Sequence, residues 1–224
     1  MLLDKLTAIF APARCFKCEQ VGSSLCAKCH QIYLEEIPSR CYRCHKATNQ
    51  HQVCKTCRAS IKLNHFWVYT LYDGLSKELI HSLKFERSGY LAKDIAKILT
   101  DFLPILPEGT IITHVPTAPK RIRIRGYDQS KLIARHISEL KKLEYTPLFT
   151  RTSNSRQVGA SREQRFKQVK DSFELSKKFT VKNKKILIVD DVTTSGATIE
   201  HLAKLLKSAG AKSIDAVVFA QAID

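Results

Sequence analysis

The sequence predicts an α/β protein with a doubly wound, mainly parallel sheet and a small cysteine-rich module ahead of it. Two observations lead to this prediction. Apolar, strand-like runs alternate with segments of helical periodicity from residue 65 onward, and all eight cysteines lie before residue 58. A chain of 224 residues is long enough for one sizeable α/β domain and a small appendage. We therefore expect two units, residues 1–64 and residues 65–224.

The larger unit shows a regular order of expected elements. Strands are expected at residues 65–72, 111–115, 147–150, 186–189 and 213–220, and helices at residues 75–83, 91–102, 130–143 and 197–208. Asp73-Gly74 predicts a turn after the first strand, and Pro104 and Pro107 end the second helix. Residues 151–172 are polar and show no such pattern.

Charge and hydropathy indicate the binding partners and the cellular compartment to expect. The formal net charge is +16, or +12 if the cysteines are thiolates holding two Zn²⁺, so polyanionic partners are expected. No apolar run reaches the ~18–20 residues that a membrane span needs. The first ten residues are too short and too charged for a secretory signal, and Arg14 before Cys15 argues against lipoprotein processing. We expect a cytoplasmic protein.

That N-terminal segment has a periodicity of its own. Its apolar residues recur at helical spacing, namely Leu2, Leu3, Leu6, Ile9 and Phe10. The pattern favours a short helix packed on the larger unit, with a helix for a partner or a membrane surface as the alternative.

The cysteines form four CxxC pairs. The pairs are Cys15/Cys18, Cys26/Cys29, Cys41/Cys44 and Cys54/Cys57. Two such turns bring four thiolates to one tetrahedral ion, so the pattern predicts two structural Zn²⁺ ions in a rigid double ribbon. A disulfide framework fits poorly with a reducing cytosol, and four redox motifs in a row are a second alternative. Sequential pairing of the cysteines closes shorter loops than crossed pairing and is favoured.

The most specific pattern lies near the C-terminus. An apolar strand runs into Asp190-Asp191 and then into a loop of small residues before a helix. The loop is Thr193, Thr194, Ser195, Gly196, Ala197 and Thr198. Its hydroxyls, its N–H groups and the helix dipole suit a phosphate, whose oxygens Gly196 leaves room for. The two carboxylates suit sugar hydroxyls. The sequence therefore predicts a ribose 5-phosphate site, with an acidic strand-end turn as the alternative for the aspartates alone.

This stretch resembles the phosphoribosyltransferase signature, and further motifs narrow the resemblance. They are Leu83-Lys84-Phe85, Val115-Pro116 at a strand end, Arg125-Gly126-Tyr127-Asp128-Gln129, the segment with Gln157 and Ser161-Arg162, and the CxxC array. Together they resemble the ComF family of competence proteins over nearly the whole chain. The sequence departs from that family's usual form at Tyr127-Asp128, which replace Phe-Asn, and in the leucine-serine spacing of residues 158–161.

The resemblance implies a type I phosphoribosyltransferase fold that binds phosphoribosyl pyrophosphate with Mg²⁺. Asp190 and Asp191 would hold the ribose 3′- and 2′-hydroxyls. Backbone N–H groups of a pyrophosphate loop would hold the diphosphate, and this loop is Val115, Pro116 and Thr117. Contacts to the diphosphate or to nucleic acid are expected from Lys120, Arg121, Arg123, Arg125, Gln129 and Arg162. Residues 120–130 and 151–165 would form a hood and a lid.

Three functions remain open. The resemblance implies a factor that helps take up or process single-stranded DNA in natural transformation, with a DNA-translocating helicase of the competence machinery as a partner. Basic clusters at residues 120–135, 151–170 and 177–185 favour it. The alternatives are an active phosphoribosyltransferase on an unidentified acceptor, or an amidophosphoribosyltransferase-like enzyme, and a protein that senses phosphoribosyl pyrophosphate without turnover.

Single-strand binding normally adds aromatic side chains on which bases stack. The aromatic candidates are Tyr42, Phe66, Trp67, Tyr69 and Tyr127. Phe66 and Trp67 lie in an expected apolar strand, so we expect these two to pack in the core.

Overall fold

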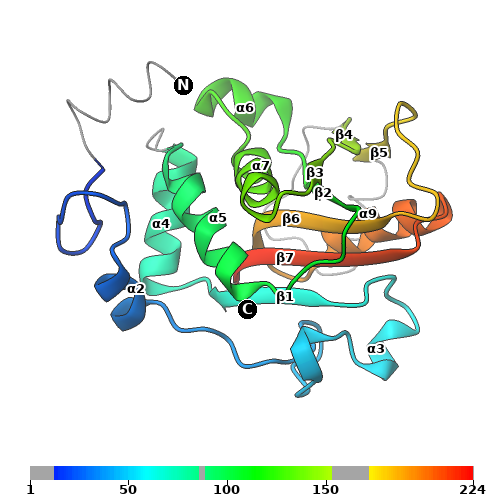
Figure 1. Ribbon diagram of the computed structural model, residues 1–224, viewed down its shortest axis with the longest axis horizontal. Coiled ribbons are helices and arrows are strands. Elements are labelled where there is room, and N and C mark those ends of the chain that lie inside the picture. Colours follow the sequence, from blue (N-terminus) through cyan, green and yellow to red (C-terminus); the bar gives the residue numbers. More distant parts are fainter. Residues whose placement is uncertain (1–12, 86–88, 153–171, 224) are drawn as a thin grey trace.

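A five-stranded parallel sheet forms the centre of the protein. The computed structural model describes residues 13–85, 89–152 and 172–223 (Figure 1). The strands are β1 (Phe66–Leu71), β2 (Thr110–His114), β3 (Glu144–Tyr145), β6 (Lys185–Thr193) and β7 (Ser213–Gln221). Their order is β1-β7-β6-β2-β3, and each neighbouring pair is parallel. The predicted α/β fold class is thereby confirmed.

Helices cover both faces of this sheet, as expected for strands that are apolar on both sides. The helices α4 (Gly74–Phe85), α5 (Leu91–Phe102) and α7 (Gln129–Lys141) lie on one face, and α9 (Ala197–Ser208) lies on the other (Figure 1). Alternate side chains of β6 divide between the faces. Leu187 and Val189 pack with the first three helices, and Ile186 and Ile188 pack with α9. The centre of the molecule is therefore a doubly wound sheet.

Three short elements lie at one end of the sheet, and only one of them, the strand expected at residues 147–150, was predicted from the sequence. Helix α6 (Pro119–Arg125) follows β2, and strands β4 (Phe149–Arg151) and β5 (Phe173–Leu175) pair antiparallel in a small second sheet. Basic residues alternate with isoleucines in α6, which is a strand-like pattern, and β5 is too short to show alternation. Strand β6 also extends beyond the expected residue 189, through Asp190 and Asp191 to Thr193, because it stays paired with β7.

The cysteine-rich segment contributes to the core of the sheet from both sides. It contains α2 (Ala27–Tyr33), the 3-10 turn η1 (Asn49–His51) and α3 (Lys55–Arg58). Leu25 and Leu34 belong to the buried cluster under α4 and α5, whereas Ile61 and Leu63 belong to the cluster under α9. The backbone is joined as well, since Asn64 N donates to Ile214 O at 2.9 Å. The domain boundary at residue 64 stays a prediction.

Two further predictions fall outside the described residues. They are the N-terminal helix over Leu2, Leu3, Leu6, Ile9 and Phe10, and most of the predicted lid, including Arg162. In the described ranges, every helix is too short or too polar to cross a lipid bilayer.

Ile61→Ala is expected to lower the free energy of unfolding by roughly 2–4 kcal/mol, because a buried side chain shared by the ribbon and the sheet leaves a cavity. Ile61 is 1% exposed. Denaturation should be followed by the fluorescence of Trp67, the only tryptophan, and by zinc release to a chromogenic chelator. Both midpoints should fall together. Ile32→Ala, at a side chain 58% exposed, should change stability by less than about 0.5 kcal/mol. A shift in zinc release alone would mean that the ribbon unfolds separately.

Candidate functional site

A cavity of about 590 Å³ lies at the carboxyl ends of β2 and β6. Ligands of parallel α/β sheets bind at this edge. The structure brings most of the predicted site residues together here. They are Val115, Pro116, Thr117, Arg121, Arg125, Gln129, Asp190, Asp191, Thr193, Thr194, Ser195, Gly196, Ala197 and Thr198. Lys120 and Arg123 are exposed on α6 and do not line the cavity, and Arg162 lies outside the described residues.

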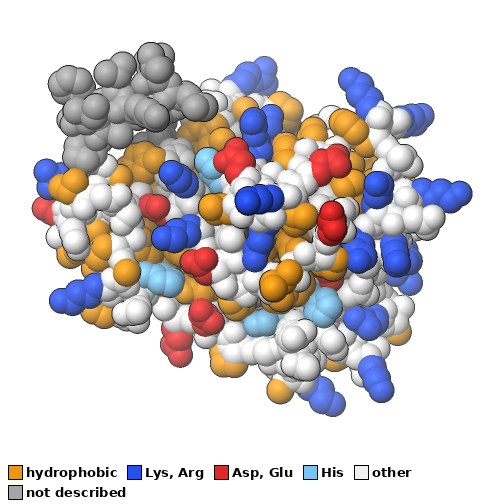
Figure 2. All heavy atoms as spheres, viewed as in Figure 1, with side chains coloured by type: hydrophobic (Ala, Val, Ile, Leu, Met, Phe, Trp, Pro, Cys, Tyr) orange, Lys and Arg blue, Asp and Glu red, His pale blue; other side chains and the backbone are white. Residues whose placement is uncertain are grey.

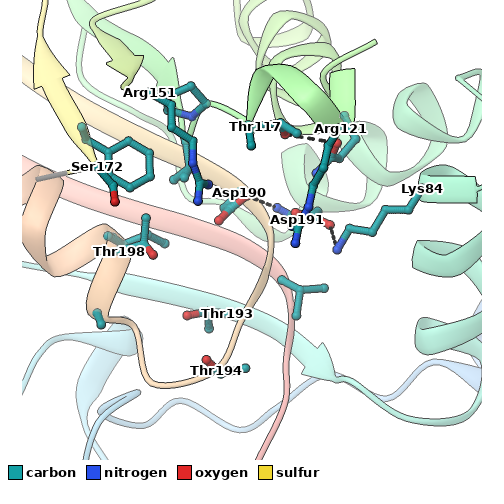
Figure 3. Close-up of a pocket in the computed structure, with 18 of the residues that line it drawn as sticks. Lys84, Thr117, Arg121, Arg151, Ser172, Asp190, Asp191, Thr193, Thr194 and Thr198 are labelled. Carbon is teal, nitrogen blue, oxygen red and sulfur yellow. Dashed lines mark hydrogen bonds and ion pairs between the residues drawn. The ribbon is translucent and has the colours of Figure 1, made fainter. Parts of the chain in front are cut away.

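The two aspartates differ in their electrostatic surroundings. Lys84 of α4 forms an ion pair with Asp191 Oδ2 (Figure 3). Burial by itself would raise the pKa of Asp191, but the ammonium of Lys84 outweighs it and lowers that pKa. Ser130 Oγ donates to Asp190 Oδ1 at 2.7 Å, yet burial and the neighbouring charge of Asp191 raise the pKa of Asp190 well above its ordinary value. The pair therefore combines a stable carboxylate with one that protonates readily.

Two cations of the cavity were not assigned to it from the sequence. Lys84 and Arg151 point in from opposite sides, with the aspartates between them (Figure 3). The guanidinium of Arg151 lies over the ring of Phe173, 5.1 Å from its centroid. The signal for Lys84 was the motif Leu83-Lys84-Phe85, and Arg151 belonged to a basic stretch attributed to nucleic acid. Among the described residues, the cavity is thus lined by two cations that the sequence predicted, Arg121 and Arg125, and by two that it did not.

Hydrogen bonds within the protein hold the connection after β2, and its predicted contact with a diphosphate stays a prediction. Thr117 N donates to Asp128 Oδ2 at 2.8 Å, and Val115 N donates to Val189 O at 3.0 Å. Pro116 has no N–H group. These positions therefore have no backbone donor left for a diphosphate in this conformation, because both N–H groups are already used.

Asp128 explains one departure from the family motif. Its Oδ2 accepts from Thr117 N, while Oδ1 accepts from Thr117 Oγ1 at 3.1 Å and from Lys131 N at 3.2 Å. A carboxylate has two acceptor oxygens, whereas an asparagine has one. Asp128 thus fixes the connection after β2 and caps α7 at the same time.

Arg121 and Arg125 are the guanidinium groups that α6 contributes to the cavity. Arg125 is 8% exposed, donates to Gln129 Oε1 at 2.8 Å, and lies over the ring of Phe85 at 5.3 Å. Arg121 is exposed. Guanidinium groups suit phosphate oxygens because they donate in a planar fork. These two residues are therefore better placed to bind a diphosphate than the backbone after β2.

The loop of residues 193–198 leads into α9 with the geometry of an anion site. Gly196 caps the helix with φ +76°, a conformation that favours glycine. The first N–H groups of a helix have no partner within it, and the loop's hydroxyls line the same cavity. A Cβ on Gly196 would lie 2.5 Å from Tyr42 Cε2. Packing against Tyr42, which lies between Cys41 and Cys44, thus also requires glycine at this position. The room that Gly196 was predicted to leave for phosphate oxygens stays a prediction.

The eight cysteines converge in two groups of four. The ligand atoms lie within 4.8 Å of one another among Cys15, Cys18, Cys26 and Cys29, and among Cys41, Cys44, Cys54 and Cys57. The favoured sequential pairing is therefore confirmed, and each group fits a tetrahedral Zn²⁺ with no open position.

One thiol in each cysteine group has a lowered pKa, which favours the thiolate form that binds a metal. Burial would raise the pKa of Cys15, but hydrogen bonds from backbone N–H groups, first that of Cys26, lower it to about 6. The N–H of Cys57 lowers the pKa of Cys54 to about 7. Since thiolates are the form that binds Zn²⁺, each group already favours one ligand.

The cavity offers fewer candidate metal ligands than either cysteine group. In the described part of the chain, the two cysteine groups are the only sets of three or more side chains close enough to hold an ion. The cavity therefore has no cage of its own for Mg²⁺ there. An ion bound with phosphoribosyl pyrophosphate would be held chiefly by phosphate oxygens and water.

Four of the five aromatic candidates for stacking are buried, and Tyr127 is half-buried. Phe66, Trp67, Tyr69 and Tyr42 are each 5% exposed or less. The hydroxyl of Tyr127 donates to Leu83 O and its ring packs against the core. The burial expected for Phe66 and Trp67 is confirmed, and Tyr42 and Tyr69 are buried as well, so these four cannot stack on bases in this conformation. Stacking by Tyr127 stays a prediction.

Comparisons with known proteins agree with this geometry. The family model for the phosphoribosyl transferase domain matches residues 127–224. Competence protein ComFC of Streptococcus pneumoniae is 28% identical over 86% of this chain and 85% of its own. DNA utilization protein YhgH of Escherichia coli is 30% identical, over 61% of this chain and 63% of its own length. With the parallel sheet, the domain match shows the type I phosphoribosyltransferase fold.

Among solved structures, the allosteric regulatory enzyme of purine biosynthesis aligns with a TM-score of 0.39 at 19% identity. The alignment covers 59% of this chain and 25% of that one.

Asparagine substitutions at the two aspartates are expected to shift stability in opposite directions. Asp191→Asn should lower the free energy of unfolding at pH 7 by roughly 1–3 kcal/mol, because Lys84 loses its partner. A lowered pKa gives stability above the ordinary value of 3.8, so the deficit should shrink as pH falls through the folded-state pKa. Asp190→Asn should add about 1 kcal/mol at pH 7, because a raised pKa costs stability as pH rises above 3.8.

Thermal unfolding of both variants and the wild type between pH 3 and pH 8 measures this contrast. A shift of the same sign for both variants at pH 7 would contradict the assignment of the two pKa values.

Proposed function

The chain belongs to the ComF family of competence proteins, and we propose that it serves DNA uptake in the cytoplasm with a site for phosphoribosyl pyrophosphate. The observation that carries the proposal is the cavity. It is lined by the loop of residues 193–198, which we call the phosphate loop, by the acidic pair Asp190 and Asp191, and by several cations. In this proposal the protein handles single-stranded DNA, with a DNA-translocating helicase as a further partner.

The chemistry of the cavity supports binding of a ribose 5-phosphate group. The start of α9 and the hydroxyls of Thr194 and Thr198 suit the 5-phosphate. Asp190 and Asp191 suit the 2′- and 3′-hydroxyls, because a carboxylate accepts from both. Arg121 lines the same cavity as the other cations, and its guanidinium group suits a diphosphate on the anomeric carbon. Mg²⁺, when bound, would neutralise part of the diphosphate charge.

The surface of α6 supports a separate contact with DNA. Arg121 and Arg125 line the cavity, whereas Lys120 and Arg123 of the same helix are exposed outside it. Figure 2 shows further Lys and Arg side chains gathered on the right-hand side of the molecule, away from α6, which lies at the top of the same view in Figure 1. Phosphate contacts of this kind bind nucleic acid without sequence preference and weaken with salt. DNA phosphates therefore have cations available that a ligand in the cavity does not use.

One observation favours turnover as a second candidate function. Phe85 and Ile124 line the cavity although their side chains are 63% and 67% exposed. An apolar surface beside the sugar site suits a flat acceptor, which would displace diphosphate at the anomeric carbon through an oxocarbenium-like state. Pyrophosphate release with an acceptor would support this candidate. Binding without release from a broad acceptor panel would support a sensor of phosphoribosyl pyrophosphate.

Asp191→Ala is expected to weaken binding of ribose 5-phosphate and of phosphoribosyl pyrophosphate by about tenfold or more, measured by titration calorimetry. The variant removes an acceptor of two hydroxyl hydrogen bonds, each worth about 1 kcal/mol. Asp101→Ala, at an exposed aspartate of α5, is the matched control and should bind like the wild type. An unchanged affinity in Asp191→Ala would remove this residue from the site.

The double variant Lys120→Ala/Arg123→Ala is expected to weaken binding of single-stranded DNA while leaving ribose 5-phosphate affinity within about twofold. The slope of log affinity against log salt should fall by about 0.7 for each lost phosphate contact. In transformation assays, this variant and Asp190→Ala/Asp191→Ala should both reduce DNA uptake. DNA affinity that is absent at low salt, or insensitive to salt, would rule out the DNA contact.

A further inference from the structure

A tyrosine of the second ribbon, the segment that carries Cys41, Cys44, Cys54 and Cys57, packs against the phosphate loop. Tyr42 stands between Cys41 and Cys44, is 2% exposed, and packs on Phe66 with ring centroids 4.1 Å apart. Its ring fills the space where a side chain on Gly196 would be, since that Cβ would meet Tyr42 Cε2 at 2.5 Å. The loop therefore rests on an aromatic surface that the ribbon supplies.

Hydrogen bonds join the same tyrosine to both sides of the loop. The hydroxyl of Tyr42 donates to Glu200 Oε1 at 2.5 Å, and Glu200 is a 1% exposed residue in the first turn of α9. The side chain of Gln221 donates to Tyr42 O at 3.1 Å and lies 3.5 Å from Thr194 O. Tyr42 thus contacts the helix that follows the loop, and a single β7 side chain links it to the start of the loop.

The neighbour of Tyr42 strengthens this attachment. Arg43 Nη1 lies 3.9 Å from Glu200 Oε2, so both residues between Cys41 and Cys44 reach the same buried carboxylate. The backbone of a CxxC turn is fixed when its two thiolates share one metal. A metal bound by this group would therefore fix the position of the two side chains that hold Glu200.

The first ribbon makes different contacts and provides a natural comparison. Lys17 pairs with Glu78 of α4 at 2.8 Å, and Ser24 N donates to Asp94 of α5 at 2.8 Å. These contacts lie on the helices of the opposite face of the sheet, away from α9. Both ribbons thus carry four cysteines, but the first contacts α4 and α5, whereas the second contacts α9 and the phosphate loop.

We propose that Tyr42 is a positioning residue of the phosphate loop, and that the metal of the second cysteine group controls the order of this loop through it. Loss of that metal would loosen residues 193–200 and weaken binding of the phosphate. Loss of the first metal would not. The effect on ligand affinity rests on the proposed function, whereas the effect on loop order does not.

Cys44→Ser and Cys18→Ser form a matched pair, because each replaces the exposed second cysteine of the first CxxC turn in its group. Zinc content by mass spectrometry should fall from two ions to one in each full-length variant. Hydrogen exchange of residues 193–200 should rise in Cys44→Ser and stay at the wild-type level in Cys18→Ser. Ribose 5-phosphate affinity should fall about tenfold in the former and stay within about twofold in the latter. Equal effects of the two variants would overturn the proposal.

Substitutions at Tyr42 test the contact with both metals in place. Tyr42→Leu should keep two zinc ions, speed exchange of the loop and weaken ribose 5-phosphate by about tenfold. Tyr42→Phe keeps the ring and should recover most of the affinity. Tyr33→Leu, at a 53% exposed tyrosine of α2, is the control. Wild-type loop exchange in a zinc-replete Tyr42→Leu would overturn the proposal.

The two proposals fail in different ways. If the wild type does not bind ribose 5-phosphate, the proposed function fails. Hydrogen exchange in Cys44→Ser and Tyr42→Leu still decides whether the ribbon orders the loop.

Discussion

The adjacent carboxylates at the end of β6 impose the main physical constraint on this structure. Asp191 is 4% exposed, and a buried carboxylate without a partner costs several kcal/mol. The compensation comes from separate helices, because Lys84 of α4 pairs with Asp191 and the hydroxyl of Ser130 of α7 donates to Asp190. Both helices must therefore pack at fixed positions over the same edge of the sheet. The acidic pair and the cation of Lys84 therefore lie together in the lining of the cavity.

The opposite face of the sheet supports the other half of the site. The phosphate loop, residues 193–198, and α9 lie over a core that includes Tyr42, Phe66 and Cys41 of the second cysteine group. A loop rich in glycine and small residues has few side-chain contacts of its own, so its order depends on the surface beneath it. The acidic pair is thus held from the face of α4 and α7, and the phosphate loop from the face of the second ribbon. A ligand that joins a sugar to a phosphate would bridge the two.

The sequence predicted those parts of the protein in which local pattern and environment agree. Buried parallel strands are continuous apolar runs, so β2, β6 and β7 were found, and the acidic pair and the loop are contiguous in the chain. The rest required contacts between distant residues. Tyr42 and Glu200 are 158 positions apart, and Lys84 reaches Asp191 across more than one hundred residues. A single sequence gives no sign of such pairs. The pairing of β6 with β7 also overrides the low strand propensity of two aspartates.

The acidic pair also explains how one basic protein would keep two phosphate ligands apart. DNA phosphates and phosphoribosyl pyrophosphate are attracted by the same cations, so Arg121 and Lys120 alone do not discriminate between them. Asp190 and Asp191 do, because they accept hydrogen bonds from a free diol and repel an unpaired phosphodiester. An internal nucleotide of DNA has neither a 2′-hydroxyl nor a free 3′-hydroxyl, so it would leave both carboxylates without donors. Under the proposed function, the cavity would therefore select the ribose ligand, and the strand would be confined to the exposed cations around it.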